Sequence, residues 1–341
     1  MLLKFREGSM TRCLIVVLLA WCTLLAHAGE ADDRTAIGRE FDAAFQRGDF
    51  AAIETRYNRA VAAKERLPSG VFVSSRFVYS MFGSLPKLPH EAAPKGNDAY
   101  WTPIEERARK WSAQYPKSTI AAITLANAYV RHGWEYRGGG YANTVAKEDW
   151  QKLKVYVGKA YEVLAGRAEV GRGDPTWRWQ MLYVGRLHGW SDEKYQAFAQ
   201  SALDDFPEFY DIYFEVAERL VPQWGGSVEA VNAFMDHAVE RTKATEGRAL
   251  YARIYWSVGS YLGSKALLDG TVKWSKVRGG FEDLVKRYPD PWNLNYFARM
   301  ACNAGDKATT RHVIAAIGQN IDTAVWEERA SWVRCRNWAE S

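Results

Sequence analysis

The residues best suited to bind a ligand lie in one glycine-rich stretch, residues 129–145. Arg137 stands close in sequence to Trp134, Glu135 and Tyr141, and Gly139 is the middle of three consecutive glycines. Guanidinium groups beside aromatic faces bind carboxylates, phosphates or sugar acids, or simply stack on the rings. Three glycines in a row are equally typical of a sharp helix–helix connection, because glycine adopts backbone conformations closed to other residues. The stretch therefore predicts either a binding loop or a structural turn.

The spacing predicts that one helix ends near Gly133 or Trp134 and that the next begins near Asn143 or Thr144. These glycines match neither a phosphate-binding loop nor a dinucleotide-binding motif, because no strand precedes them and position 143 is Asn. His132, beside the loop, is the one histidine with a position of interest, yet a lone histidine is more often structural or solvated. None of the six histidines has another at metal-ligand spacing, so we expect no metal site and no cofactor.

Two further stretches combine aromatic residues with tight turns or arginine. Residues 220–231 place Trp224 at a turn before Ser227, a predicted helix N-cap. Residues 250–257 place Tyr251 and Tyr255 four apart on one helical face, with Arg253 pointing elsewhere. The ligand-binding surface that we expect is a concave groove lined by Trp134, Arg137 and Tyr141, with Trp224, Tyr251 and Arg253 as further candidates.

Acidic residues offer a second kind of chemistry. Asp211, Glu215 and Glu218 fall on one face of a predicted helix, where paired carboxyl groups can act as general acid and base. An ion-paired or solvated face is the simpler interpretation, and Arg253 is expected to be buried against Glu215 or Glu218. Glu135 is the best single acid candidate. The chain has no HExxH, CxxC, G-x-S-x-G or Walker motif, so a binding module is favoured over an enzyme.

The elements that must position these residues are helices. Helical periodicity recurs along almost the whole chain, and no segment shows convincing strand alternation. The sequence therefore predicts an all-α protein with an N-terminal helical region over 29–85 and a helical-repeat domain over 99–341. A segment over 86–98, with three prolines, is expected to be a linker or long loop.

Two parts of the chain look like copies of one helical hairpin. Asp174-Pro175 begins a predicted helix that ends near Gly189, and Asp290-Pro291 begins one that ends near Gly305. Repeated hairpins of this size predict an array of antiparallel hairpins that forms a tetratricopeptide-like superhelix. No copy carries the full tetratricopeptide consensus, so the repeats are degenerate.

The N-terminus is typical of a secretory signal peptide. Basic residues precede an apolar run over 14–25, and Ala26-His27-Ala28 is a small-residue cleavage site. Cleavage after Ala28 would send the chain to the periplasm or outside the cell and would leave no membrane span. Met10 is an alternative start. A lipoprotein would carry its lipid on Cys22, but the bulky Trp21 disfavours that alternative.

Charge and cysteine content restrict the partners. The net charge of +5 falls to about +3 once Lys4, Arg6, Arg12 and Glu7 leave with the signal, and no basic block remains. We therefore expect no nucleic acid partner, but a protein, a peptide or an acidic ligand; the oligomeric state is left open. Cys302 and Cys335 remain after cleavage, and either form a disulfide or stay free, with Cys302 buried in a helix.

Four sequence stretches together resemble the bacterial domain-of-unknown-function 4034 family. They occur in family order within residues 40–265. The resemblance implies a helical, tetratricopeptide-like protein with no established activity, and it supplies no catalytic residue. The stretches are residues 68–70, residues 137–145 with Trp150, residues 220–227 and residues 250–256.

Overall fold

The computed structural model describes residues 29–85, 95–263 and 265–341, and within these ranges helices are joined by turns and loops, with no strands. The predicted signal peptide and most of the predicted linker lie outside the described residues. The all-α prediction is confirmed, and an isolated bridge between Arg66 and Phe72 is the one β-type pairing in these ranges. No helix in the described part of the chain is both long and apolar enough to cross a membrane. The helices are α1 (Glu30–Arg47), α2 (Phe50–Ala62), α3 (Val73–Ser80), α4 (Asp98–Gln114), α5 (Thr119–Arg137), α6 (Lys147–Ala165), α7 (Ala168–Gly171), α8 (Pro175–His188), α9 (Asp192–Asp205), α10 (Tyr210–Arg219), α11 (Val228–Glu246), α12 (Ala249–Leu262), α13 (Trp274–Arg287), α14 (Pro291–Asn303), α15 (Lys307–Ile317), α16 (Thr323–Trp326) and α17 (Arg329–Glu340), with short 3-10 turns η1 (Ala142–Thr144) and η2 (Pro222–Trp224).

The helix boundaries follow capping chemistry that the sequence displays. The Asp174 carboxylate accepts hydrogen bonds from the backbone of Thr176 and Trp177, and the Asp290 carboxylate accepts one from the backbone of Trp292 at the start of α14. Both helices carry proline at the first position, where a missing N–H costs nothing. Gly189 ends α8 in the left-handed region, at φ 83°. Both predicted Asp-Pro helix starts are therefore confirmed.

Helices adjacent in sequence pack against one another along most of the chain, including α4 with α5, α5 with α6, α11 with α12 and α14 with α15. The N-terminal helices join this array through a core of aromatic rings. Trp111 of α4 is fully buried and stacks on Phe50 with ring centroids 5.2 Å apart. Its indole N–H donates to Glu54 at 2.8 Å, which satisfies the one polar atom of that ring.

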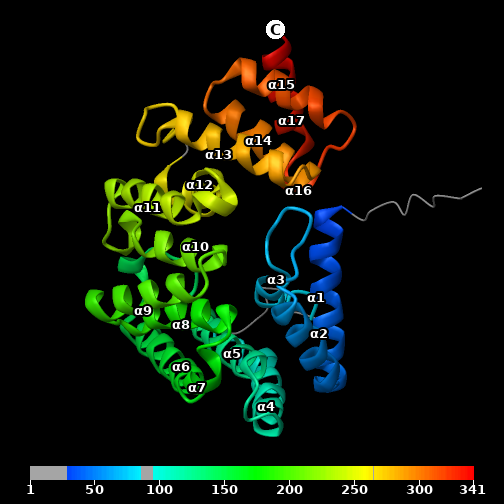
Figure 1. Ribbon diagram of the computed structural model, residues 1–341. Helices are drawn as coiled ribbons and strands as arrows, with labels where there is room; N and C mark the ends of the chain where they lie inside the picture. The colour runs from blue at the N-terminus through cyan, green and yellow to red at the C-terminus, as the bar shows by residue number, and fades with distance from the viewer. Residues whose placement is uncertain (1–28, 86–94, 264) are drawn as a thin grey trace, which may run out of the picture.

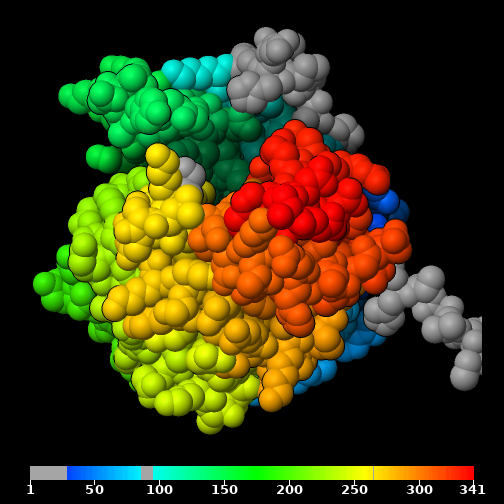
Figure 2. Space-filling model, turned by 90° about the horizontal axis from the view of Figure 1, so that it is seen from above, coloured from blue at the N-terminus to red at the C-terminus, as the bar shows by residue number. Residues whose placement is uncertain are grey.

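The helices follow one another round a ring, which the N-terminal helices close (Figure 1). Helix α1 contacts α14, and α3 contacts α5, so the first helices touch both the middle and the end of the chain. From above, α13 to α17 cover much of one end of the molecule (Figure 2). The region 29–85 therefore packs as one part of the ring.

A disulfide between Cys302 and Cys335 joins α14 to α17, with the two Cα atoms 5.9 Å apart. The sequence left this pairing open, and the structure makes it. The helix α17 has only Trp332 and Ala339 buried, so little apolar area holds it in place. We therefore expect the disulfide to contribute much of the stability with which the C-terminal helix α17 is held against α14.

Replacing both cysteines by alanine should lower the free energy of unfolding by about 3 kcal/mol, because a closed loop of this size restricts the unfolded chain. Urea denaturation of the oxidised protein and of the Cys302→Ala/Cys335→Ala variant measures the difference. Wild type treated with a reductant serves as the control and should match the variant. An unchanged urea midpoint would contradict the fastening role.

Candidate functional site

The glycine-rich stretch forms the exposed end of α5 and the loop that follows it. Helix α5 continues to Arg137, one turn beyond the expected end, and α6 begins at Lys147 after the turn η1. The expected boundaries were wrong because Gly133 is not a helix breaker here. A Cβ atom at Gly133 would lie 2.9 Å from the Cβ of Tyr156, so this glycine lets α6 approach α5 closely.

The candidate residues of this stretch lie on the outer surface. Glu135, Gly139 and Tyr141 are exposed, and Tyr141 keeps 85% of its surface accessible. Arg137 donates to the carbonyls of Gly138 and Gly140 at 2.9 and 2.5 Å. Its guanidinium lies 5.3 Å from the Trp134 ring and 4.9 Å from the Trp150 ring. Arg137 therefore ties the loop to its own helix, and ligand binding here stays a prediction.

The other sequence candidates are distributed over separate surfaces. Trp224 lies in η2, where the guanidinium of Arg186 sits 4.6 Å from its ring. Tyr251 donates to Asp236 at 2.6 Å, on another side of α12 from Arg253. Among the predicted ligand-binding residues, Arg253 alone lines the large central cavity described next. The structure does not bring these candidates together into one groove.

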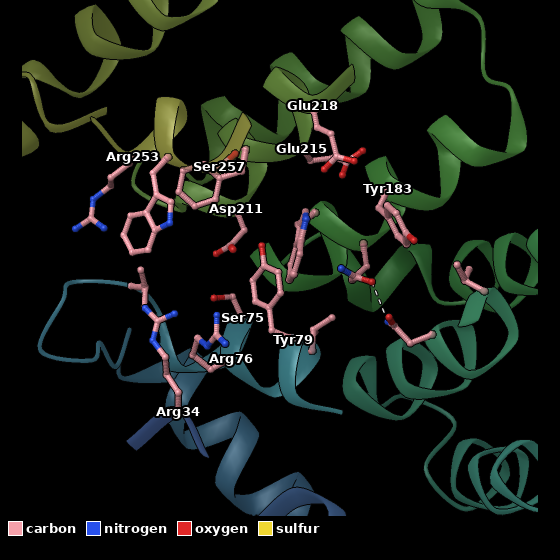
Figure 3. A pocket seen from close by; sticks show the side chains of 18 of the residues that line it. Arg34, Ser75, Arg76, Tyr79, Tyr183, Asp211, Glu215, Glu218, Arg253 and Ser257 are labelled. Atoms are coloured by element: carbon pink, nitrogen blue, oxygen red, sulfur yellow. Dashed lines mark hydrogen bonds between the residues drawn. The ribbon is translucent and has the colours of Figure 1, made fainter. Parts of the chain in front are cut away.

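A cavity of about 510 Å³ lies inside the ring, and α1, α3, α5, α8, α10 and α12 all contribute to its wall. Figure 3 shows Arg34, Arg76 and Arg253 gathered at one end of it. Glu215, Glu218 and Tyr183 lie toward the other end, with Asp211 and Tyr79 between them (Figure 3). Tyr79 keeps 47% of its surface accessible, and this surface faces the cavity that it lines. The cavity is therefore accessible to solvent at its centre. Its size is that of a small-molecule site.

The arginines at one end are incompletely paired. Arg34 is held by Glu30 at 2.6 Å and lies over the Trp292 ring. Arg253 is buried and donates through Nη2 to the Ser69 carbonyl at 2.8 Å, but its Nε and Nη1 have no partner among the described residues. The expected partners Glu215 and Glu218 are not bonded to it. That expectation was wrong because Arg186, on the neighbouring helix α8, forms ion pairs with both glutamates.

Arg76 is the most unusual of these arginines. Its guanidinium lies 4.7 Å from the Tyr79 ring, and no hydrogen bond to it is formed within the described ranges. Burial, together with the nearby charge of Arg34, lowers the pKa of Arg76 to about 10. Asp211 acts in the opposite direction on the same pKa. Arg76 is still cationic at neutral pH, so the structure places a charged donor group in the cavity without a bonded partner.

The acidic face of α10 forms the opposite wall. Glu215 accepts from Arg186 Nε at 2.7 Å, and Glu218 accepts from Arg186 Nη2 at 3.0 Å. Burial raises the pKa of Glu215 to about 7, and Arg186 opposes this rise. Burial also raises the pKa of Asp211, while hydrogen bonds with Ser75 and Tyr79 and the charge of Arg76 oppose the shift. The predicted shared face is confirmed: all three carboxylates line the cavity.

Neutral side chains fill the wall between the two ends. Asn127 donates to Gln180 at 2.8 Å and to the Ile123 carbonyl at 3.0 Å. Trp179 packs against Tyr79 with ring centroids 5.0 Å apart, and Trp256 lies near Arg253 on α12. The cavity thus combines cations, carboxylates, amides and aromatic faces, as binding sites for polar organic molecules do.

Sequence reasoning missed Arg34 and Arg76. Each lies within an ordinary helical pattern, and nothing in the local sequence marks it. The one usable signal is that Arg76 interrupts the run of apolar and small residues from Val71 to Val78. A charged residue on an otherwise buried short helix calls for a partner or a ligand.

His132 occupies a structural position between α4 and α5. Its Nδ1 lies 2.5 Å from Glu105 Oε1, and its Nε2 lies 2.9 Å from Asp98 Oδ1. Both ring nitrogens are thus occupied by carboxylates. In the ranges that the structure describes, no group of three or more His, Cys, Asp or Glu side chains is placed to hold a metal ion.

No protein-family model matches the chain, and no curated protein matches it. The resemblance noted from the sequence therefore stays a prediction, and the geometry of the cavity carries the functional argument.

Replacing Arg186 by methionine should destabilise the protein strongly at pH 8 and weakly at pH 5. The variant leaves Glu215 buried without its cation, which costs about 3 kcal/mol when the carboxylate is ionised. Burial raises the Glu215 pKa from 4.5 to about 7, so between these values the folded state holds a proton that the unfolded chain has released. Stability therefore falls as pH rises through this window, and removal of Arg186 raises the pKa further. Urea denaturation at the two pH values measures the effect.

Arg334→Met is the matched control. Arg334 pairs with Glu328 on the surface, with 66% and 59% of the two side chains exposed. Loss of an exposed pair should change the free energy of unfolding little at either pH. An equal, large loss at pH 5 and pH 8 in Arg186→Met would mean that Glu215 does not titrate in this range.

Proposed function

We propose that this chain is an exported binding protein that takes a small acidic ligand in its central cavity. The observation that carries the proposal is Arg76, a cation that lines the cavity without a hydrogen-bond partner among the described residues. A buried charge is costly unless it is paired. Arg253 adds a second positive charge at the same end of the cavity. A carboxylate or phosphate of a ligand would supply Arg76 with an acceptor, since guanidinium groups bind such anions through paired hydrogen bonds.

The cavity dimensions support a small ligand or a short peptide. A volume of about 510 Å³ lies within the range of small-molecule sites and is too small for a folded domain. The wall carries aromatic rings at Tyr79, Trp179 and Trp256, which give a polar organic molecule an apolar face to rest on. A duplex nucleic acid does not fit such a space, and no nucleic acid partner is proposed.

The proposed cellular address is the periplasm or the cell exterior. The Ala26-His27-Ala28 cleavage site supports it, and so does the Cys302–Cys335 disulfide, because disulfides persist in oxidising compartments. We also propose that the helical hairpins form a degenerate tetratricopeptide-like superhelix. Its support is the successive packing of neighbouring helices and the shared Asp-Pro caps of α8 and α14.

A second candidate is a carboxylate-dependent enzyme acting on cell-wall or glycan material. The observation that favours it is the cavity face of Asp211, Glu215 and Glu218, where burial raises the pKa of Asp211 and Glu215. Both glutamates are bonded to Arg186, which disfavours proton transfer by them. Glu135 lies on the outer surface. If the enzyme alternative holds, the wild-type protein should release soluble fragments from purified cell-wall material. The Asp211→Asn variant should release none.

Arg76→Ala should weaken the binding of anionic probes at least about tenfold, since it removes a charge-assisted hydrogen bond of about 1.5–3 kcal/mol. Isothermal titration calorimetry with galacturonate, citrate, acetyl-alanine and inorganic phosphate measures the affinity. The free energy of unfolding should stay the same or rise, because an unpaired buried charge is removed. A purely structural arginine would instead lower stability when it is lost.

Arg137→Ala is the control for Arg76→Ala, because Arg137 lies outside the cavity beside aromatic rings of the same kind. Its affinity for every probe should equal that of wild type. Binding that depends on Arg137 and not on Arg76 would transfer the site to the glycine-rich loop. If no anionic probe binds to wild type, the proposed function fails.

A further inference from the structure

The two ends of the central cavity carry opposite charge. Arg34, Arg76 and Arg253 lie at one end, Glu215 and Glu218 lie at the other, and Asp211 lies between them (Figure 3). A simple anion would use only the arginine end. We infer that the ligand is a short peptide with free termini, whose C-terminal carboxylate lies at Arg76 and whose α-ammonium lies at Glu218. This inference rests on the proposed function, because it assigns the kind of molecule whose carboxylate the same cavity takes.

The acidic end has an excess of negative charge. Glu215 and Glu218 share the single guanidinium of Arg186, at 2.7 and 3.0 Å. Tyr261 forms a hydrogen bond with Glu218, but a hydroxyl does not neutralise a carboxylate. The nearby Arg219 is bound to Asp192 at 2.6 Å and does not supply a second cation. The Glu218 side chain is 31% exposed and lines the cavity, so a ligand ammonium can reach it.

The arginine end has the complementary excess. Glu30 pairs with Arg34, and both Glu30 and Asp211 act on the charge of Arg76, but neither Arg76 nor Arg253 forms an ion pair with a described carboxylate. Arg76 also makes no hydrogen bond to any described residue. A terminal carboxylate has two acceptor oxygens and one negative charge, which fits this end in both respects.

The distance between the ends fits a few residues of extended chain. Asp211, beside Arg76, and Glu218 are seven positions apart on α10, which is about 10 Å along a helix axis. Three extended residues span about 10 Å. A tripeptide can therefore place one terminus at each end of this wall, whereas a single amino acid cannot.

The neutral wall supplies groups that match a peptide backbone. The Asn127–Gln180 hydrogen bond uses Asn127 Nδ2 and Gln180 Oε1. Asn127 Oδ1 and Gln180 Nε2 make no hydrogen bond within the part of the chain that the structure describes. One is an acceptor and the other a donor, the same pair of functions that a peptide group needs. Trp179, Phe214 and Val130 line the cavity close by and offer apolar contact to peptide side chains.

The test compares peptides that differ only in their terminal charges. Isothermal titration calorimetry is run on the full mature chain with Ala-Phe-Ala and Ala-Ala-Ala, their N-acetyl forms and their C-terminal amides. Both free peptides should bind at least about tenfold more tightly than either blocked form, because each blocked form loses a partly desolvated charge pair. An N-acetyl peptide that binds as tightly as the free peptide would overturn the inference, and so would free peptides that do not bind.

Two variants assign the termini. In Glu218→Gln the free and N-acetyl peptides should bind equally, because the ammonium of the free peptide then has no carboxylate partner. In Arg76→Ala the free and amidated peptides should bind equally for the same reason. Glu135→Gln removes an exposed carboxylate of α5 outside the cavity and should leave every affinity unchanged. Circular dichroism melts check that each variant is folded, and Glu218→Gln retains the Arg186–Glu215 pair.

The outcomes separate this inference from the proposed function. If N-acetyl peptides, citrate or phosphate bind and lose affinity in Arg76→Ala while the free ammonium adds nothing, the site is an anion site and the peptide assignment fails. If a free peptide binds but its affinity is unchanged in both Glu218→Gln and Arg76→Ala, binding occurs elsewhere and both proposals fail.

Discussion

The backbone carbonyl of Ser69 is the point at which the ring closes. It accepts hydrogen bonds from Arg253 of α12 at 2.8 Å and from Asn293 of α14 at 3.2 Å. On the other side, the Ser69 backbone N–H and hydroxyl donate to Glu30 of α1 at 3.0 and 2.7 Å. Hydrogen bonds to charged groups contribute about 1.5–3 kcal/mol each, so this one residue fastens three distant helices.

The turn that presents Ser69 depends on its neighbour Gly70. Gly70 has φ +90°, and a Cβ atom there would lie 2.6 Å from Nη2 of Arg253. A larger residue would be strained in this conformation and would displace the guanidinium from the carbonyl. Arg66 adds a bond to the Gly70 carbonyl at 2.8 Å and one to the Tyr210 hydroxyl at 2.5 Å. The local turn thus determines the position of the Arg253 guanidinium.

The arginines inside the protein differ in the hydrogen bonds that they make. Arg186 is satisfied by two glutamates, and Arg131 donates to the carbonyls of Met81 and Val78 at 2.7 and 3.3 Å. These bonds offset most of the cost of burial. Arg76 has no such bond among the described residues. Arg76 therefore differs from Arg186 and Arg131, whose guanidinium groups each form hydrogen bonds with protein acceptors.

Local chemistry made the helices predictable, whereas the cavity required information that local patterns do not contain. The pair Asp174-Pro175 predicts a helix start, because Asp is a preferred N-cap residue. The shared face of Asp211 and Glu218 follows from helical spacing alone. Arg253 was recognised as unusual, but its partner Ser69 lies 184 residues away. Arg34 and Arg76 become neighbours only when α1 and α3 dock inside the ring. The glycine-rich loop is predicted as either a binding loop or a structural turn, because both use the same residue types and sequence alone does not distinguish them.

Because the two halves of the cavity come from different parts of the chain, binding of the proposed ligand would be linked to ring closure. Arg34 and Arg76 belong to the N-terminal region, while Asp211, Glu218 and Arg253 belong to the later helices. A ligand that touches both halves binds the closed ring and not the open one. It then stabilises closure by about 2.7 kcal/mol when present at one hundred times its dissociation constant. That is comparable to one of the bonds at Ser69. The ligand and the Ser69 turn therefore support the same contact between the first helices and the rest of the ring.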